Sequence, residues 1–196
     1  MVNLILDVET TGLPLKSARR YPYYKDSKSY DTSRVISVSW IITSSKNRVL
    51  EKHYYVIKPI DFRISRESTA IHGITRRDAM DTGILFTEAV AHLRKSLANH
   101  PCKVIVAHNI FFDFNILLSE FYRIRAHDMI TAFYSMERFC TMMNGKKKLG
   151  LSKFPKLVDL YLTLTGTKLE NAHNALADAE GCSMCFTALL DMSSSS

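Results

Sequence analysis

The feature that most constrains the fold is an apolar run at the start of the chain, residues 2–14, with the sequence VNLILDVETTGLP. An apolar run that ends at Thr-Thr-Gly indicates a buried central strand. Asp7 and Glu9 lie two positions apart near its end, so their side chains project from the same face. Two like charges side by side in a buried strand need a counter-charge, because desolvation and mutual repulsion both oppose them. Carboxylate oxygens favour magnesium or manganese as that counter-charge. A strand end exposed to solvent is the alternative.

The length of 196 residues fits one domain, and a hydrophobic content of 46% is ordinary for a globular protein. We expect residues 1–192 to form that single domain and residues 193–196 to be a disordered tail. The apolar runs are short and broken by charges, so we expect no membrane span. The chain begins directly with the strand, and its four cysteines are scattered. These features favour an intracellular protein that is not secreted.

The net charge of +7 favours a negatively charged substrate such as a nucleic acid, because the acidic residues are concentrated in a few motifs. A basic protein without such a partner is the alternative. Residues 16–33 mix tyrosine with lysine and arginine, which predicts either a loop that contacts phosphates and bases or a mobile surface loop. Residues 145–150 (GKKKLG) predict a basic loop that is solvated or contacts phosphate.

The periodicity of the rest of the chain predicts alternating strands and helices. A hairpin is expected at residues 34–43 and 49–57, a buried strand at 103–107 and an edge strand at 138–142. Helices are expected at residues 86–99, 111–125, 155–165 and 174–192. Cys182 and Cys185 fall within the last helix without a second cysteine pair nearby, so they are expected to be buried apolar residues rather than zinc ligands.

Four further polar residues have no certain role when each is considered alone. Asp113 falls in the first turn of a predicted helix, where the helix dipole favours any carboxylate. His72 on its own indicates a surface or structural histidine more than a ligand. His173 and Asp178 would point about 140° apart if both lay in one helix. They can converge only if His173 precedes the helix and Asp178 lies in its first turns.

Taken together, these residues resemble the DEDDh family of 3′-to-5′ exonucleases, to which the proofreading epsilon subunit of bacterial DNA polymerase III belongs. The family's motifs occur in order as Asp7-Val8-Glu9-Thr10-Thr11-Gly12, Ala107-His108-Asn109-Ile110-Phe111-Phe112-Asp113, and His173 followed by Asp178. Residues 71–75 (IHGIT) and 138–141 (RFCT) also resemble family segments. The resemblance covers about residues 1–190, and no catalytic position is missing.

The resemblance implies an α/β fold of the ribonuclease H-like type, with a mixed five-stranded sheet flanked by helices on both faces. It also implies hydrolysis with two divalent ions, Mg²⁺ or Mn²⁺, roughly 4 Å apart. The implied metal ligands are Asp7, Glu9, Asp178 and Asp113. His173 would be the general base, because a neutral imidazole can take a proton from the attacking water.

The implied substrate is the 3′ end of single-stranded or frayed DNA, in proofreading or repair, with a DNA polymerase as a candidate partner. The resemblance assigns substrate contacts to Thr10, Thr11, Gly12, Leu13, His72, Ile74 and Asn109. The expected location is the cytoplasm or wherever DNA is replicated. An exoribonuclease that trims RNA ends is the main alternative, and a nucleic-acid-binding module without catalysis is a second one.

Overall fold

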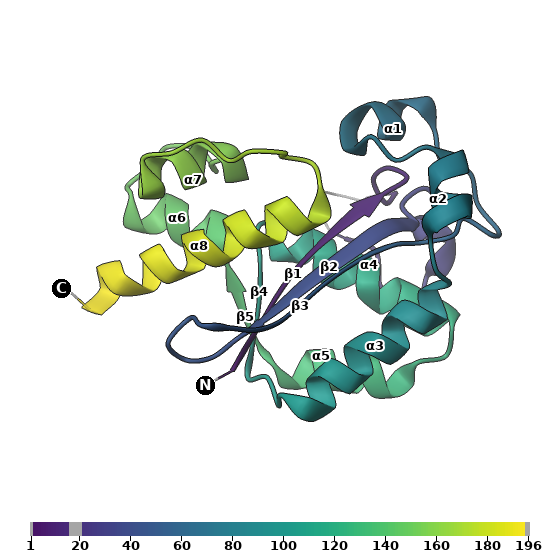
Figure 1. The fold of residues 1–196 in the computed structure, drawn as a ribbon, viewed down its shortest axis with the longest axis horizontal. Coiled ribbons are helices and arrows are strands. Elements are labelled where there is room, and N and C mark those ends of the chain that lie inside the picture. The colour runs from purple at the N-terminus through teal and green to yellow at the C-terminus, as the bar shows by residue number, and fades with distance from the viewer. Residues whose placement is uncertain (1, 16–20, 195–196) are drawn as a thin grey trace.

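A computed structural model describes residues 2–15 and 21–194 of the chain. Its five strands form one mixed sheet in the order β3-β2-β1-β4-β5 (Figure 1). The strands are β1 (Asn3–Thr10), β2 (Val35–Thr43), β3 (Val49–Val56), β4 (Val104–Ala107) and β5 (Glu137–Cys140). β1 is central, antiparallel to β2 and parallel to β4, and β4 is parallel to the edge strand β5.

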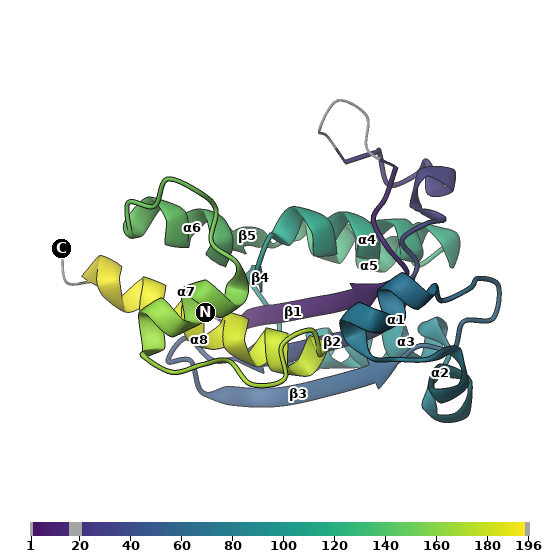
Figure 2. The ribbon, with the colours of Figure 1, turned by 90° about the horizontal axis from the view of Figure 1, so that it is seen from above.

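Helices cover both faces of this sheet (Figures 1 and 2). The helices are α1 (Arg66–His72), α2 (Arg76–Thr82), α3 (Phe86–Asn99), α4 (Ile110–Arg123), α5 (His127–Ser135), α6 (Thr141–Lys148), α7 (Leu157–Thr165) and α8 (Ala175–Ser194). The fold is therefore the α/β arrangement with a mixed five-stranded sheet that the sequence predicted. No helix among residues 2–15 and 21–194 is long and apolar enough to cross a membrane.

The alternation of side chains along β1 divides the core into two layers. Leu4, Leu6 and Val8 pack into the larger cluster with residues of α3, α4 and α5. Ile5 points the other way and packs against Ala179 and other residues of α8. Since side chains two positions apart share a face, Asp7 and Glu9 lie on the face that α8 covers.

The neighbours of the two acidic residues in β2 are small and polar. Asp7 is paired with Ser39 and Glu9 with Ser37, and both serines are fully buried. Residues paired across neighbouring strands project from the same face. The acidic residues therefore lie beside short side chains that leave space above the sheet.

Long periodic elements were predicted well and short ones were not. The predicted helix 86–99 is α3, and the predicted edge strand is β5. The seven-residue helices α1 and α2, and α5, were not predicted, because a short helix with an exposed face shows no full apolar period. The sequence signals available for α1 and α2 were their caps. The Ser65 and Thr75 side chains accept hydrogen bonds from backbone N–H groups of the first turn.

Two other expectations need correction. Residues 145–148 of the basic segment predicted as a loop form the last turn of α6, and residues 149–150 follow the helix; a side chain in place of Gly145 would meet Leu160. The last helix continues through Ser194, two residues into the predicted tail, and residues 195–196 lie outside the described part of the chain.

In the predicted loop 16–33, residues 27–30 form a 3₁₀ helix, and residues 16–20 are not described. Cys182 and Cys185 are buried and free, as expected.

Candidate active site

The centre of the site is the carboxylate pair on β1. Burial raises the pKa of Asp7 well above its usual value, and the nearby charges of Asp113, Asp178 and Glu9 raise it further. Burial and the charge of Asp178 raise the pKa of Glu9 to about 8. In the absence of a cation, these carboxyl groups favour their protonated forms.

The third carboxylate comes from the start of α4. Asn109 adopts a left-handed conformation with φ 62°, which turns the chain from β4 into α4 and places Asp113 in the first turn. The Asp113 side chain is 2% exposed, and its Oδ1 accepts a hydrogen bond of 3.2 Å from the backbone N–H of Val8. Burial raises the pKa of Asp113, although this hydrogen bond opposes the shift. Asp113 is thus fixed against the strand that carries Asp7 and Glu9.

The fourth carboxylate and the histidine come from the start of α8. The Oδ1 atom of Asn174 accepts hydrogen bonds from the backbone N–H groups of Leu176 and Ala177, which caps the helix. His173 therefore precedes the helix, in a left-handed conformation with φ 68°. Its backbone N–H donates to Oδ2 of Asp178 at 3.0 Å. This is the arrangement that the sequence required for the two residues to converge.

These elements bring the predicted catalytic residues into one cluster. Ligand atoms of Glu9, His173 and Asp178 all lie within 4.8 Å of one another. Asp7 and Asp113 lie close enough to Glu9 and Asp178 that the charges of Glu9 and Asp178 raise the pKa values of Asp7 and Asp113. None of the ion pairs among the described residues involves these four carboxylates.

The donor set fits a divalent metal ion. Four carboxylates without a lysine or arginine partner repel one another, and a bound cation would remove that repulsion. Carboxylate oxygens suit magnesium and manganese, which are hard cations. The cluster is therefore an acidic site able to hold a metal ion.

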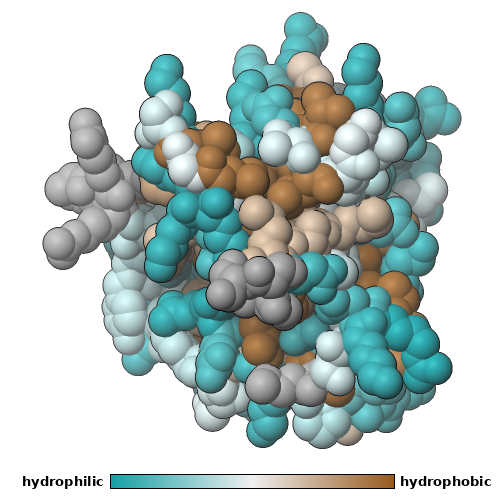
Figure 3. Space-filling model, turned by 90° about the vertical axis from the view of Figure 1, so that its left-hand side faces the viewer, coloured by the Kyte–Doolittle hydropathy of each residue, from teal (hydrophilic) through white to brown (hydrophobic). Residues whose placement is uncertain are grey.

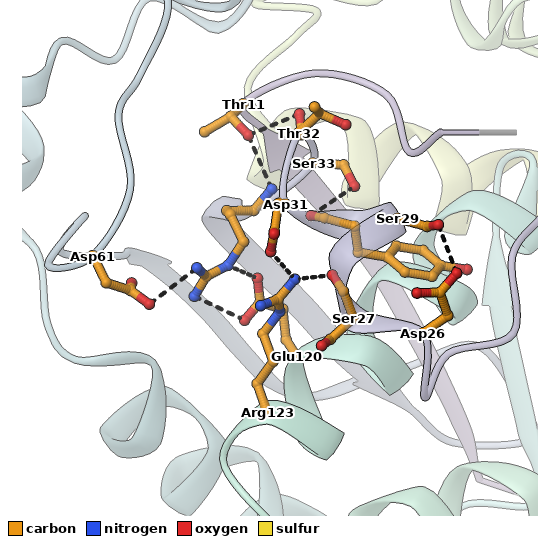
Figure 4. Close-up of polar contacts among 12 residues, drawn as sticks. Thr11, Asp26, Ser27, Ser29, Asp31, Thr32, Ser33, Asp61, Glu120 and Arg123 are labelled. Atoms are coloured by element: carbon orange, nitrogen blue, oxygen red, sulfur yellow. Dashed lines mark hydrogen bonds and ion pairs between the residues drawn. The ribbon is translucent and has the colours of Figure 1, made fainter.

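The turn after β1 is held by a polar network (Figure 4). The Thr11 hydroxyl donates to the carbonyl of Thr32 at 3.0 Å and accepts from the backbone N–H of Arg34 at 2.9 Å. The Thr10 hydroxyl donates to the carbonyl of Gly12 at 2.7 Å. Leu13, by contrast, is 68% exposed. The network fixes the turn and leaves the apolar side chain of Leu13 in solvent.

Helix α1 lies beside the C-terminal end of β1 in both ribbon views (Figures 1 and 2). His72 ends this helix, and its Nδ1 accepts a hydrogen bond of 3.0 Å from the backbone N–H of Ile74. Its Nε2 is buried without a hydrogen-bond partner. The Asn109 side chain makes no capping hydrogen bond. His72 and Asn109 thus each have hydrogen-bonding capacity that the protein does not use.

Two features near the site were missed from the sequence. Burial raises the pKa of Tyr54 on β3, and the charge of Glu9 raises it further, which places the phenol near the acidic cluster. Arg34 and Glu120 form an ion pair of 2.6 Å beneath the turn after β1. A tyrosine within a strand gives no local sequence signal of its contacts, and neither do an arginine and a glutamate that lie far apart in the sequence. The pairing of Ser39 with Tyr54 only becomes visible once the sheet register is known.

Comparisons with known proteins show the family of the chain and structures that resemble it. A family model described as "RNase_T: Exonuclease" matches residues 4–183. No curated protein sequence matches the chain at a significant level.

Three solved structures illustrate the structural similarity. An exonuclease I structure superposes with a TM-score of 0.72 at 22% identity over 97% of this chain. E. coli exonuclease I in complex with a dT13 oligonucleotide gives 0.71, also at 22% identity over 97% of this chain. Exonuclease X in complex with 5′ overhanging duplex DNA gives 0.63 at 18% identity, covering 98% of this chain and 93% of the other. The chain spans only 41% of the length of these two exonuclease I chains.

Proposed function

This chain belongs to the RNase T exonuclease family, and we propose that it removes nucleotides from the 3′ ends of single-stranded or frayed DNA, with residues 1–192 as its catalytic domain. The observation that carries this proposal is the convergence of four unpaired carboxylates and His173 from β1, α4 and the start of α8. The positive net charge supports a polyanionic substrate.

Asp7, Glu9, Asp113 and Asp178 would hold two divalent ions, Mg²⁺ or Mn²⁺. When bound, such ions lower the pKa of water and neutralise charge on the phosphate and the leaving oxygen. The burial of Asp7 and Asp113 keeps their carboxylates in fixed positions. Their mutual repulsion disfavours an empty site in which all four groups are charged, so divalent cations and protons would compete for these carboxylates.

His173 would accept the proton of the attacking water. Its side chain is exposed, and it lies next to Glu9 and Asp178 at the mouth of the cluster. Its backbone N–H is held by Asp178, so the ring extends from a fixed point of the chain. An imidazole in such a position can exchange protons with solvent between turnovers.

The 3′-terminal nucleotide would bind beside the turn after β1 and the end of α1. Exposed Leu13 would pack against the terminal base, with His72, Ile74 and Asn109 around the nucleotide. Thr10, Thr11 and Gly12 would present backbone groups to the sugar, since the hydroxyls of Thr10 and Thr11 are used within the turn. The Nε2 atom of His72 has no partner within the protein but is buried, so a contact between it and the substrate would require the ring to become accessible.

The test is metal-dependent nucleotide release from matched DNA and RNA strands carrying a 5′ or a 3′ label. We expect mononucleotides from the 3′ end of DNA, no release in chelator, and loss of release in Asp7→Ala and His173→Ala. Asp159→Ala is the matched control, because Asp159 is an exposed acidic residue in the first turn of α7. Faster removal of a mismatched than of a paired 3′ end would support proofreading. Faster hydrolysis of RNA would overturn the DNA assignment, and no release from either strand would overturn the proposal.

A further inference from the structure

A groove between α6 and the segment after it lies outside the acidic cluster. It has a volume of about 580 Å³ and is lined by Met143, Asn144, Lys146, Lys147, Leu151 and Phe154, with Gly150 at its end. We propose that this groove, named here the α6 groove, binds the single strand upstream of the 3′ end that enters the active site. The inference rests on the proposed function, because it identifies where the rest of that substrate lies.

The α6 groove combines an aromatic ring with cations. Phe154 is 56% exposed, and the Nζ atom of Lys146 lies 4.5 Å from the centroid of its ring. Met143 and Leu151 add exposed apolar surface on either side. Proteins that bind single strands without sequence preference use this combination, in which bases stack on aromatic rings while cations contact phosphates.

The charged side chains around the α6 groove are all positive. Residues 141–156 contain five lysines and no acidic residue. Lys148 is already engaged, since its Nζ donates to the carbonyl of Leu189, and it holds α6 against α8. Lys153 and Lys156 are exposed on either side of Phe154 and Pro155. A surface of this kind attracts a polyanion. A single-stranded nucleic acid would use both the cations and the exposed ring of Phe154, whereas an acidic protein segment would use only the cations.

The α6 groove is connected to the active site through His108. This residue directly follows β4, and its ring contacts the Thr141 hydroxyl at 3.0 Å and the Pro155 carbonyl at 3.1 Å. Thr141 begins α6, and Pro155 follows Phe154, so one histidine fixes both walls of the groove. It is followed by Asn109 and the start of α4, which carries Asp113.

The distance from the acidic cluster suits a strand of several nucleotides. β1, β4 and β5 are parallel neighbours, so the start of α6 lies about 10 Å from β1 at the same edge of the sheet. Figure 3 faces the end of the molecule that carries α6 and α7, and it shows hydrophobic side chains set among hydrophilic ones there. Single-strand sites commonly span about 4 to 16 nucleotides, which is enough to reach from the cluster into the groove.

The experiment compares a long and a minimal substrate in two groove variants, Phe154→Ala and Lys146→Glu/Lys147→Glu. The long substrate is a 20-nucleotide single-stranded DNA, and the minimal one is the p-nitrophenyl ester of thymidine 5′-monophosphate, which reaches only the active site. The control is Lys46→Glu/Arg48→Glu, which makes the same charge change in the exposed β2–β3 hairpin at the far end of the sheet. Binding of the labelled 20-mer is also measured by fluorescence anisotropy in chelator.

We expect each groove variant to bind the 20-mer about 10-fold more weakly or worse, the effect of losing one stacked base or its phosphate contacts. Hydrolysis of the thymidine ester should stay at the wild-type rate, and the charge variant should show a shallower dependence of affinity on salt than the control. Equal binding in groove and control variants would overturn the inference, as would a preference of the groove for duplex over single strands. If wild type bound DNA through the groove but released no nucleotide, the proposed function would fail while the inference stood.

Discussion

Arg34, at the start of β2, and Glu120, near the end of α4, form an ion pair whose side chains are only 12% and 6% exposed. Nε of Arg34 lies 2.6 Å from Oε1 of Glu120, and a second guanidinium nitrogen lies 3.4 Å from Oε2. The third nitrogen contacts Asp61 at 3.1 Å. Because the backbone of Arg34 is hydrogen-bonded to Thr11, the ion pair supports the turn that follows β1 (Figure 4).

Removing the charge of Glu120 should destabilise the protein. Glu120→Gln leaves the buried Arg34 guanidinium with only the exposed carboxylate of Asp61 as an ion-pair partner, so the free energy of unfolding should fall by about 3 kcal/mol. Urea denaturation measures this. The matched control is Asp128→Asn, which breaks the exposed Arg94–Asp128 pair and should cost less than about 1 kcal/mol. Equal losses in the two variants would show that burial does not set the strength of the Arg34–Glu120 pair.

Asp7→Asn should stabilise the metal-free protein while abolishing nuclease activity. Burial and three neighbouring carboxylates disfavour the Asp7 charge, and asparagine removes that charge without changing the shape. We expect a gain of about 1–2 kcal/mol in the free energy of unfolding. Thermal denaturation in chelator and with Mn²⁺ tests both halves: Mn²⁺ should raise the melting temperature of wild type more than that of the variant. A variant that is less stable than wild type in chelator would contradict the prediction.

The free energy of unfolding should depend on pH through His108. Burial lowers the pKa of this histidine to about 4, although its hydrogen bond to the Pro155 carbonyl opposes the shift. The unfolded chain therefore binds a proton at this position before the folded protein does, so the stability that neutral His108 contributes is lost as the pH drops from 6.5 toward 4. This contribution is on the order of 2–3 kcal/mol for a shift of this size. Urea denaturation across this range should show the stability of wild type falling relative to that of His108→Gln as the pH drops, and parallel curves would refute the assignment.

Leu13→Ala should affect substrate binding and not stability. The side chain is 68% exposed, so its truncation should change the free energy of unfolding by less than about 0.5 kcal/mol. If Leu13 packs against the terminal base, KM for single-stranded DNA should rise about 5-fold, which corresponds to about 1 kcal/mol of lost apolar contact. Leu162→Ala, at an exposed position of α7, is the control and should leave KM unchanged. A KM for Leu13→Ala equal to that of the control would remove Leu13 from the substrate site.

Neighbouring residues along the chain were enough to predict the elements with long periods and the local placement of Asp7, Glu9 and His173. Alternation along β1 placed Asp7 and Glu9 on one face. The helical repeat required His173 to lie before α8, and the structure has it there. These are properties of a single segment, so neighbouring residues suffice to predict them.

Only the tertiary structure decided which polar groups meet across the fold. Arg34 and Glu120 are 86 positions apart, and any of the exposed acidic residues could have paired with Arg34 as far as the sequence is concerned. The place of Tyr54 beside Glu9 depends on the register of two strands, and the close approach of Gly145 in α6 to Leu160 in α7 depends on how these two helices pack. Such contacts are fixed by packing between distant segments, which leaves no period in the chain that could have predicted them.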